Sequence, residues 1–168
     1  LGLRLGQAYS LQTYGLFGYA FLSAPTLRQA MAIVSSYGPL TFTLFRVAFR
    51  ETATEGVLQF SRHLEIPEDL FAYYVDRDVA AALAAGEPGL QSPFRPTGIT
   101  LMHNGQGREA AYRDFFGGPV SFNGPRSEVR FDAAALDTPM PLQDAETSAI
   151  CQQQCQLLLA RMSKSSGF

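Results

Sequence analysis

The sequence predicts an α+β fold, in which an antiparallel sheet is flanked by helices and a C-terminal helix follows the last strand. Two kinds of pattern indicate this fold class. Short segments rich in aliphatic, aromatic and β-branched residues favour strands, and segments with apolar residues every three or four positions favour helices. Two pairs of expected strands are separated only by short turns, so we expect hairpins, which are antiparallel.

Residues 14–22 are expected to form the first strand, because they are aromatic and aliphatic and contain glycines that let another element approach closely. A helix follows from Thr26, whose hydroxyl can cap it, and Gln29 completes a capping box three positions later. Apolar residues at helical spacing continue to Gly38, where a Gly-Pro pair ends the helix.

A hairpin is expected next, with strands over residues 40–50 and 57–62 and a turn over residues 54–56. Pro67 and the two acids after it suit the first turn of a helix, because proline has a helical φ and negative charge is favourable there. The apolar face of this helix continues as far as Gly86.

The second half of the chain begins after a break. Prolines and glycines over residues 86–98 predict a surface loop. We then expect a strand over residues 99–103, a helix over residues 108–116, and a hairpin that pairs residues 120–122 with residues 128–132.

The last helix is expected to begin at Asp144, which suits an N-cap. On it, Cys151, Cys155, Leu158 and Met162 form an apolar stripe. The stripe predicts a dimer face or a connection to a further domain, with packing inside the subunit as the alternative. The spacing of the two cysteines suits a shared apolar face better than a disulfide, and favours a reduced, cytoplasmic compartment over a redox switch or metal capture.

The two halves show a related order of elements. Residues 37–42 and residues 116–122 both pass from an aromatic residue through Gly and Pro into an expected strand. The pattern predicts two βαββ units with a ligand-binding groove between them. The alternative is coincidence, because an aromatic residue followed by Gly and Pro is a common way for a helix to end.

Composition restricts the class of protein. The 168 residues, of which 46% are hydrophobic, suit one domain with a substantial core. The formal net charge of -2 argues against direct binding of nucleic acid by this chain, because such domains normally carry a basic surface. No apolar run approaches the ~20 residues that cross a bilayer, so we expect no membrane partner.

No catalytic motif is recognisable. The sequence has no GxGxxG, Gly-Lys-Ser/Thr or GxSxG pattern, and His63 and His103 have no neighbour at metal-ligand spacing. We therefore expect no enzyme activity, no cofactor and no metal. The Gly-Gln-Gly sequence at 105–107 suits a tight turn, or an anion site as the alternative.

The candidate ligand-binding residues are Phe17, Tyr19, Arg46, Tyr74 and His103. The aromatic rings are expected as walls of a pocket. Arg46 lies inside an apolar strand and would bind a carboxylate or phosphate, or else form a salt bridge at an outward-facing position. His103 follows an expected buried strand and would be a polar anchor, or else simply end that strand.

Five stretches, taken in order, resemble one family of bacterial regulators. Their order and spacing are similar to the arabinose-binding-type N-terminal domain of AraC/XylS-family transcription regulators, over nearly the whole chain. The stretches are residues 1–6, 14–20, 23–30, 115–122 and 131–141.

This resemblance implies that residues 1–168 form a single effector-sensing and dimerisation domain. Its expected partners are a small-molecule effector and a second copy of the chain. Promoter DNA would be bound by a C-terminal helix-turn-helix domain that is absent from this chain. The resemblance implies neither catalysis nor specificity for arabinose.

Two other functions remain open at this point. A stand-alone ligand carrier or enzyme would assemble its site only in the folded chain. A domain that only dimerises would have a filled core without a cavity.

Overall fold

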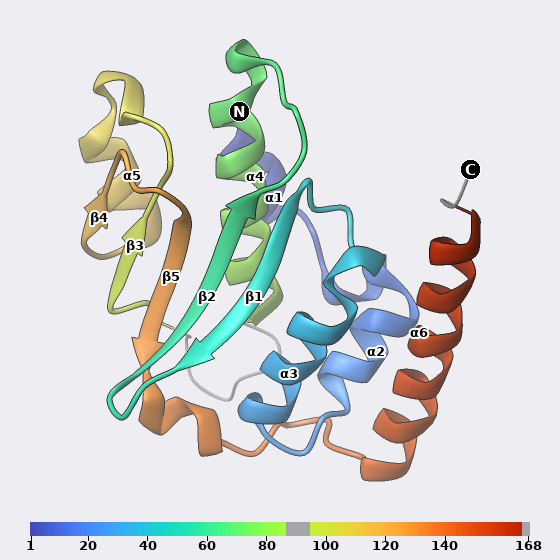
Figure 1. The fold of residues 1–168 in the computed structure, drawn as a ribbon. Coiled ribbons are helices and arrows are strands. Elements are labelled where there is room, and N and C mark those ends of the chain that lie inside the picture. Colours follow the sequence, from blue (N-terminus) through green and yellow to red (C-terminus); the bar gives the residue numbers. More distant parts are fainter. Residues whose placement is uncertain (87–94, 166–168) are drawn as a thin grey trace.

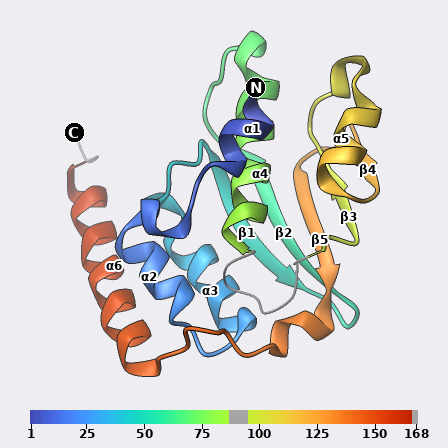
Figure 2. The same ribbon diagram turned by 180° about the vertical axis from the view of Figure 1, so that it is seen from behind.

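The computed structural model describes residues 1–86 and 95–165, in which five strands form one sheet with helices on one of its faces (Figures 1 and 2). The predicted α+β fold is confirmed. Across the sheet the strand order is β1-β2-β5-β3-β4. The strands are β1 (Phe45–Glu51), β2 (Glu55–Arg62), β3 (Gly98–Thr100), β4 (Val120–Ser121) and β5 (Ser127–Asp132). The helices are α1 (Gly2–Gln7), α2 (Leu16–Leu22), α3 (Leu27–Tyr37), α4 (Glu68–Gly86), α5 (Glu109–Phe116) and α6 (Ala145–Ser165).

The sheet has an apolar inner face and a polar outer face. β2 pairs antiparallel with both β1 and β5. Leu58 stands opposite Val129, and both are buried on the inner face. The next pair along, Gln59 and Glu128, points to the outer face, where Gln59 Nε2 donates to Glu128 Oε1 at 2.8 Å. This alternation is typical of a sheet that is covered on one side only.

The helices form the second layer. α4 crosses the inner face of the sheet and carries α1 on its outer side, while α3, α2 and α6 follow one another beyond β1 (Figures 1 and 2). The sequence did not predict α1. Its Gly2 and Gly6 are buried against α4, where a Cβ would lie 2.4 Å from the Tyr73 carbonyl oxygen and 2.2 Å from that of Arg77. Only glycine permits so close an approach.

Several expected elements are confirmed. The hairpin in the first half is β1 with β2, and α4 begins directly after Pro67. The Thr26 hydroxyl accepts a hydrogen bond from the Gln29 amide at the start of α3. Asp144 Oδ1 accepts one from the Thr147 amide at 2.7 Å at the start of α6. The expected loop over residues 86–98 lies largely outside the described residues.

The strand expected over residues 14–22 is wrong. A 3-10 helix (Leu11–Tyr14) leads into α2 there. Phe17 and Phe21, four positions apart, are buried, whereas Tyr19 between them is 53% exposed, which is the pattern of a helix. A short and almost wholly apolar run does not distinguish a buried strand from a helix.

The hairpin expected between residues 120–122 and 128–132 is also wrong. β4 pairs parallel with β3, and β5 lies between β2 and β3 and is antiparallel to both. The second half does run strand, helix, strand, strand as predicted (β3, α5, β4, β5), but the first half begins with helices in place of its first strand, so the predicted repeat of two βαββ units is not present. The turn at 123–125 predicts that the chain reverses, but it does not determine which strand the returning segment pairs with.

Gly18 is the position where the contact between α2 and the 3-10 helix is closest. A Cβ there would lie 1.8 Å from the Leu11 carbonyl oxygen, so we expect Gly18→Ala to lower the free energy of unfolding by about 2 kcal/mol or more. Chemical denaturation measures the change. Gly118→Ala is the matched control, because its Cβ would meet nothing nearer than the Pro96 carbonyl oxygen at 3.5 Å. Equal effects of both substitutions would contradict the close contact.

Candidate functional site

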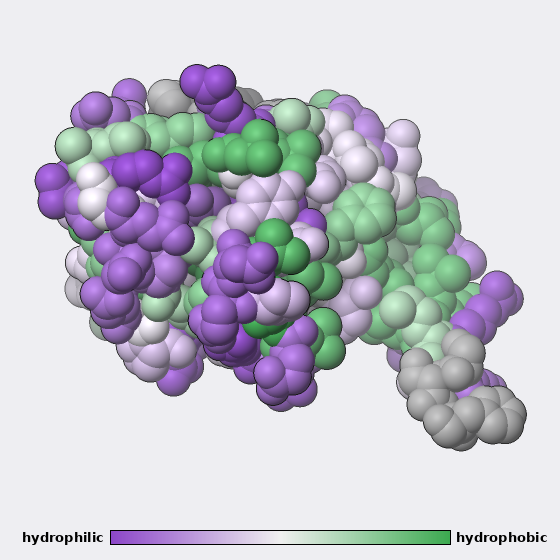
Figure 3. Space-filling model, turned by 90° about the horizontal axis from the view of Figure 1, so that it is seen from above, coloured by the Kyte–Doolittle hydropathy of each residue, from purple (hydrophilic) through white to green (hydrophobic). Residues whose placement is uncertain are grey.

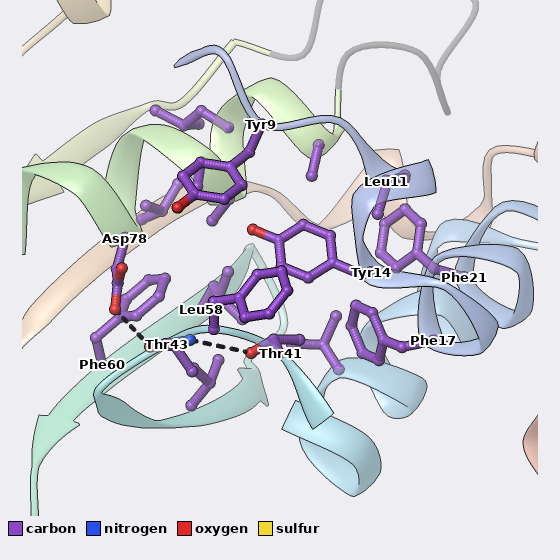
Figure 4. A pocket seen from close by; sticks show the side chains of 18 of the residues that line it. Tyr9, Leu11, Tyr14, Phe17, Phe21, Thr41, Thr43, Leu58, Phe60 and Asp78 are labelled. Carbon is purple, nitrogen blue, oxygen red and sulfur yellow. Dashed lines mark hydrogen bonds between the residues drawn. The ribbon is translucent and has the colours of Figure 1, made fainter. Parts of the chain in front are cut away.

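A cavity of about 100 Å³ lies between α2, α3, α4 and the inner face of the sheet (Figure 4). Its walls are hydrocarbon over most of their area. α2 contributes Phe17 and Phe21, α3 contributes Leu27, Met31 and Val34, the sheet contributes Val47, Leu58, Phe60, Val129 and Phe131, and α4 contributes Ala81, Ala82, Leu83 and Ala85.

Three aromatic rings stand together at one end of the cavity. The Tyr14 ring lies 6.1 Å from that of Tyr9 and 5.6 Å from that of Phe42, and the Tyr9 and Phe42 rings are 6.3 Å apart. Phe42 is 55% exposed, whereas Tyr9 and Tyr14 are half-buried. Tyr14 also meets the Phe17 ring edge to face at 6.0 Å. These rings therefore form the mouth of the cavity, between solvent and the apolar interior.

The polar side of the mouth is built around Asp78 of α4. Its Oδ2 accepts hydrogen bonds from the Thr43 hydroxyl at 2.7 Å and from the Leu44 amide at 3.1 Å. Its Oδ1 accepts from Arg77 Nε at 2.7 Å, and Arg77 Nη2 donates to the Phe42 carbonyl oxygen at 2.9 Å. The two charges thus neutralise each other and attach the segment before β1 to α4.

The Tyr14 hydroxyl is held in its neutral form. Burial, and then the negative charge of Asp78, raise the pKa of Tyr14 to about 12. Figure 4 shows the Tyr9 and Tyr14 hydroxyls directed toward the side of the cavity on which Asp78 lies. The Tyr14 hydroxyl, protonated at physiological pH like any tyrosine, thus stays a hydrogen-bond donor well into the alkaline range.

A second buried polar group lies on the other side of α4 and does not line the cavity. Asp76, His103 and Tyr112 are all buried. The Gly105 amide donates to His103 Nδ1 at 3.0 Å, so Nε2 carries the proton and donates to Asp76 Oδ1 at 2.9 Å. The Tyr112 hydroxyl donates to Asp76 Oδ2 at 2.8 Å. The group is fully paired and connects α4 to the segment after β3 and to α5.

The structure brings one of the five predicted residues to the cavity, which is Phe17. Tyr19 is exposed on the opposite side of α2, and Arg46 is exposed on β1. Tyr74 is half-buried beneath the Arg77 guanidinium, 4.8 Å from its ring centre, and His103 is buried in the Asp76 group. A role of these residues in effector binding stays a prediction.

The residues of the mouth were not among the site residues predicted from the sequence. Tyr14 and Phe17 are three positions apart, a spacing that would have indicated a common helical face if residues 14–22 had not been interpreted as a strand. Arg77 and Asp78 stand in a helix whose other residues are largely apolar, which was a second available signal. Phe42 and Tyr9 carry no signal of their own, because both lie outside regular elements.

The residues that the structure describes contain no group of three or more His, Cys, Asp or Glu side chains that could hold a metal ion. None of their helices is both long and apolar enough to cross a membrane.

Residues 1–140 match the family described as the arabinose-binding domain of AraC transcription regulators, N-terminal. The chain is 25% identical over 175 residues to uncharacterised HTH-type transcriptional regulators of Mycobacterium tuberculosis and Mycobacterium bovis, which covers 99% of this chain and 49% of each relative. It is 23% identical over 168 residues to the ornithine utilization regulator of Pseudomonas aeruginosa, with the same coverage of 99% and 49%.

The chain thus spans about half the length of the curated relatives that it matches. Among solved structures, it resembles the transcriptional regulator CdpR from Pseudomonas aeruginosa, with a TM-score of 0.75 and 22% identity over 88% of this chain and 48% of that chain. This likeness shows that the fold is shared. The family resemblance seen in the sequence is confirmed.

The raised pKa values predict how stability depends on alkaline pH. In the unfolded chain tyrosine ionises near pH 10, whereas folded Tyr14 keeps its proton to about pH 12. The pKa of Tyr112 is also raised, first by burial and then by the charge of Asp76. The unfolded state therefore binds fewer protons in this window, and the free energy of unfolding falls as the pH rises from 10 to 12.

Urea denaturation at several pH values between 10 and 12 measures how much the free energy of unfolding decreases. We expect Tyr14→Phe and Tyr112→Phe each to make this decrease smaller. Tyr19→Phe removes an exposed hydroxyl and should leave the decrease unchanged. If the free energy of unfolding decreases with pH as steeply in both Tyr14→Phe and Tyr112→Phe as in the wild type, the pH dependence does not come from these two tyrosines.

Proposed function

The chain belongs to the family of N-terminal arabinose-binding domains of AraC transcription regulators, and we propose that it senses a small-molecule effector in the aromatic cavity. The cavity is the observation that carries this proposal. Protein interiors are normally packed as densely as organic crystals. A space of about 100 Å³ with apolar walls leaves hydrocarbon surface uncovered, and a bound effector would cover it.

The cavity is connected to α6 through α2, which contacts both. α2 directs Phe17 and Phe21 into the cavity and packs against α6. The Ala20 carbonyl oxygen accepts a hydrogen bond from the Ser148 hydroxyl at 3.4 Å, and Cys155 of α6 is fully buried. A shift of α2 on effector binding would therefore move α6, provided the effector has different affinities for the two arrangements.

In the whole protein, we propose that α6 leads toward a DNA-binding helix-turn-helix domain that acts on promoter DNA in the cytoplasm. The relatives are HTH-type regulators about twice as long as this chain. The net charge of -2 also suits a domain that does not itself contact DNA. We do not extend arabinose, which the family description names, to this chain, because a sugar's hydroxyl groups would lie unpaired against hydrocarbon walls.

We propose that the outer face of α6 also binds a second copy of the chain. The predicted stripe divides in two, with Cys151 and Cys155 packed inside the subunit and Leu158 37% exposed. Ile150 and Leu157, seven positions apart, are 53% and 49% exposed. Hydrophobic surface gathers on the side of the molecule that carries the end of α6 (Figure 3). Apolar residues at this spacing suit pairing of two helices.

A thermal-shift screen tests the sensing proposal. We expect one chemical class, among amino acids, sugars, fatty acids, aromatic acids and uncharged aromatic compounds, to stabilise the chain in a dose-dependent way. A ligand at about a hundred times its dissociation constant adds roughly 2.7 kcal/mol. Ala82→Leu, which fills the cavity from α4, should abolish this stabilisation without lowering the melting temperature of the free chain.

The matched control is Ala32→Leu, which adds the same atoms at an exposed position of α3 away from the cavity. It should leave the ligand-induced shift intact. If the ligand raises the melting temperature of Ala82→Leu as much as that of the wild type, the effector binds elsewhere and the cavity is not the sensing site.

Sedimentation velocity tests the dimer. Leu157→Glu places a charge on the exposed apolar face of α6, so we expect it to convert a dimer into a monomer. Gln156→Glu adds the same charge at an exposed position of α6 that is neither three nor four positions from Ile150 or Leu157, and it should leave the dimer intact. A wild-type chain that sediments as a monomer at every concentration would contradict the proposal.

A further inference from the structure

We infer that the effector is an uncharged, mainly apolar molecule whose hydrogen-bond acceptor is bound by the hydroxyl groups of Tyr9 and Tyr14. The inference rests on the function proposed above and specifies the chemistry of the same cavity. Three features carry it: the apolar depth of the cavity, the pairing of every charge at its mouth, and the two phenol groups that remain as donors.

The deep part of the cavity offers no polar side chain. Phe17 and Phe21 face it from α2, Met31 from α3, and Leu58 and Phe131 from the sheet. A ligand atom that reaches this region gives up water without gaining a hydrogen bond, so it must be hydrocarbon to bind favourably. The body of the effector is therefore apolar.

The charges at the mouth are already paired. Asp78 accepts hydrogen bonds from Thr43, Leu44 and Arg77, and the Arg77 guanidinium is engaged with Asp78 and with the Phe42 carbonyl oxygen. An ammonium or carboxylate on the effector would enter without a counter-charge of its own. Burial of an unpaired ion in such a site is strongly unfavourable, so an uncharged effector is favoured.

Two donors remain available. Within the described residues, neither the Tyr9 nor the Tyr14 hydroxyl takes part in a hydrogen bond with another side chain or with the backbone. Both hydroxyls are directed toward the same side of the cavity (Figure 4). A tyrosine hydroxyl keeps its proton at physiological pH, and the pKa of about 12 extends this state of Tyr14 further into the alkaline range. A carbonyl or ether oxygen on the effector would complete this pair of donors.

The volume of the cavity also limits the size of the effector. It measures about 100 Å³, below the ~300–1,000 Å³ of typical pockets for drug-sized ligands. A single small ring or a short chain fits within it, and a larger effector would extend past Phe42 at the mouth.

Four five-membered-ring probes separate these features: cyclopentanone, its isostere methylenecyclopentane, cyclopentanecarboxylate and cyclopentylammonium. Each is titrated into the chain while the aromatic carbon–proton NMR signals of Phe17 and Phe21 are followed. We expect cyclopentanone to bind most tightly, methylenecyclopentane roughly fivefold to tenfold more weakly, and the two ions at least about a hundredfold more weakly.

Tyrosine variants locate the donor. Tyr14→Phe and Tyr9→Phe should each weaken cyclopentanone by roughly fivefold, the equivalent of one neutral hydrogen bond, and leave methylenecyclopentane unchanged. Tyr19→Phe removes an exposed hydroxyl of α2 outside the cavity and should change neither probe. This comparison isolates the hydrogen bond, because loss of packing would weaken both probes alike.

Other outcomes overturn the inference in distinguishable ways. If the hydrocarbon binds as tightly as the ketone in wild type and in both variants, the proposed acceptor is wrong while effector binding in the cavity stands. If either ion binds most tightly, the proposed absence of charge is wrong. If none of the four probes moves the Phe17 and Phe21 signals, this inference is refuted, and the Ala82→Leu comparison decides separately whether the cavity is the sensing site.

Discussion

Two buried aspartates of α4 determine how the helical layer sits on the sheet. Asp76 and Asp78 are two positions apart and therefore point to different sides of the helix. Asp78 accepts hydrogen bonds from a hydroxyl and an amide of the segment before β1. Asp76 accepts hydrogen bonds from His103, which follows β3, and from Tyr112 of α5. Removal of one partner from a buried charged pair typically costs about 3–5 kcal/mol. α4 is thereby attached to the segment before β1 and to the segment after β3, which lie toward opposite edges of the sheet, and the other helices pack around it.

The cavity exists because the side chains that α4 presents toward the sheet and α2 are too small to fill the distance between these elements. α4 presents the small side chains of Ala81, Ala82 and Ala85, while Phe60 of β2 and Phe17 of α2 present large rings from the other walls. Because hydrogen bonds hold α4 in place, the helix does not move inward to fill the space. The same bonds hold Phe42 at the mouth, since Arg77 donates to its carbonyl oxygen. One set of polar contacts thus maintains both the empty space and its entrance.

The regular elements were predictable where a local signal determines them. α3 and α6 have side-chain caps and α4 begins after a proline, so their starts are encoded within a few residues. Residues 14–22 lack such a signal. Gly18 permits close packing of α2 against the 3-10 helix, and Gly15 adopts a positive φ directly before α2, so neither glycine serves a strand. β5 inserts between β2 and β3, a choice that depends on burial of Val129 and Phe131 and on no feature of the turn before it.

The sequence by itself determined the α+β class, the positions of most helices, the first hairpin and the family, because caps, turns and ordered motifs act over short distances along the chain. The tertiary structure alone decided the strand order and the site. Tyr9, Phe42 and Asp78 come from three separate segments, and nothing in any one segment specifies the other two. A cavity is the space that those segments leave between them, so it exists only after the helices and the sheet have packed.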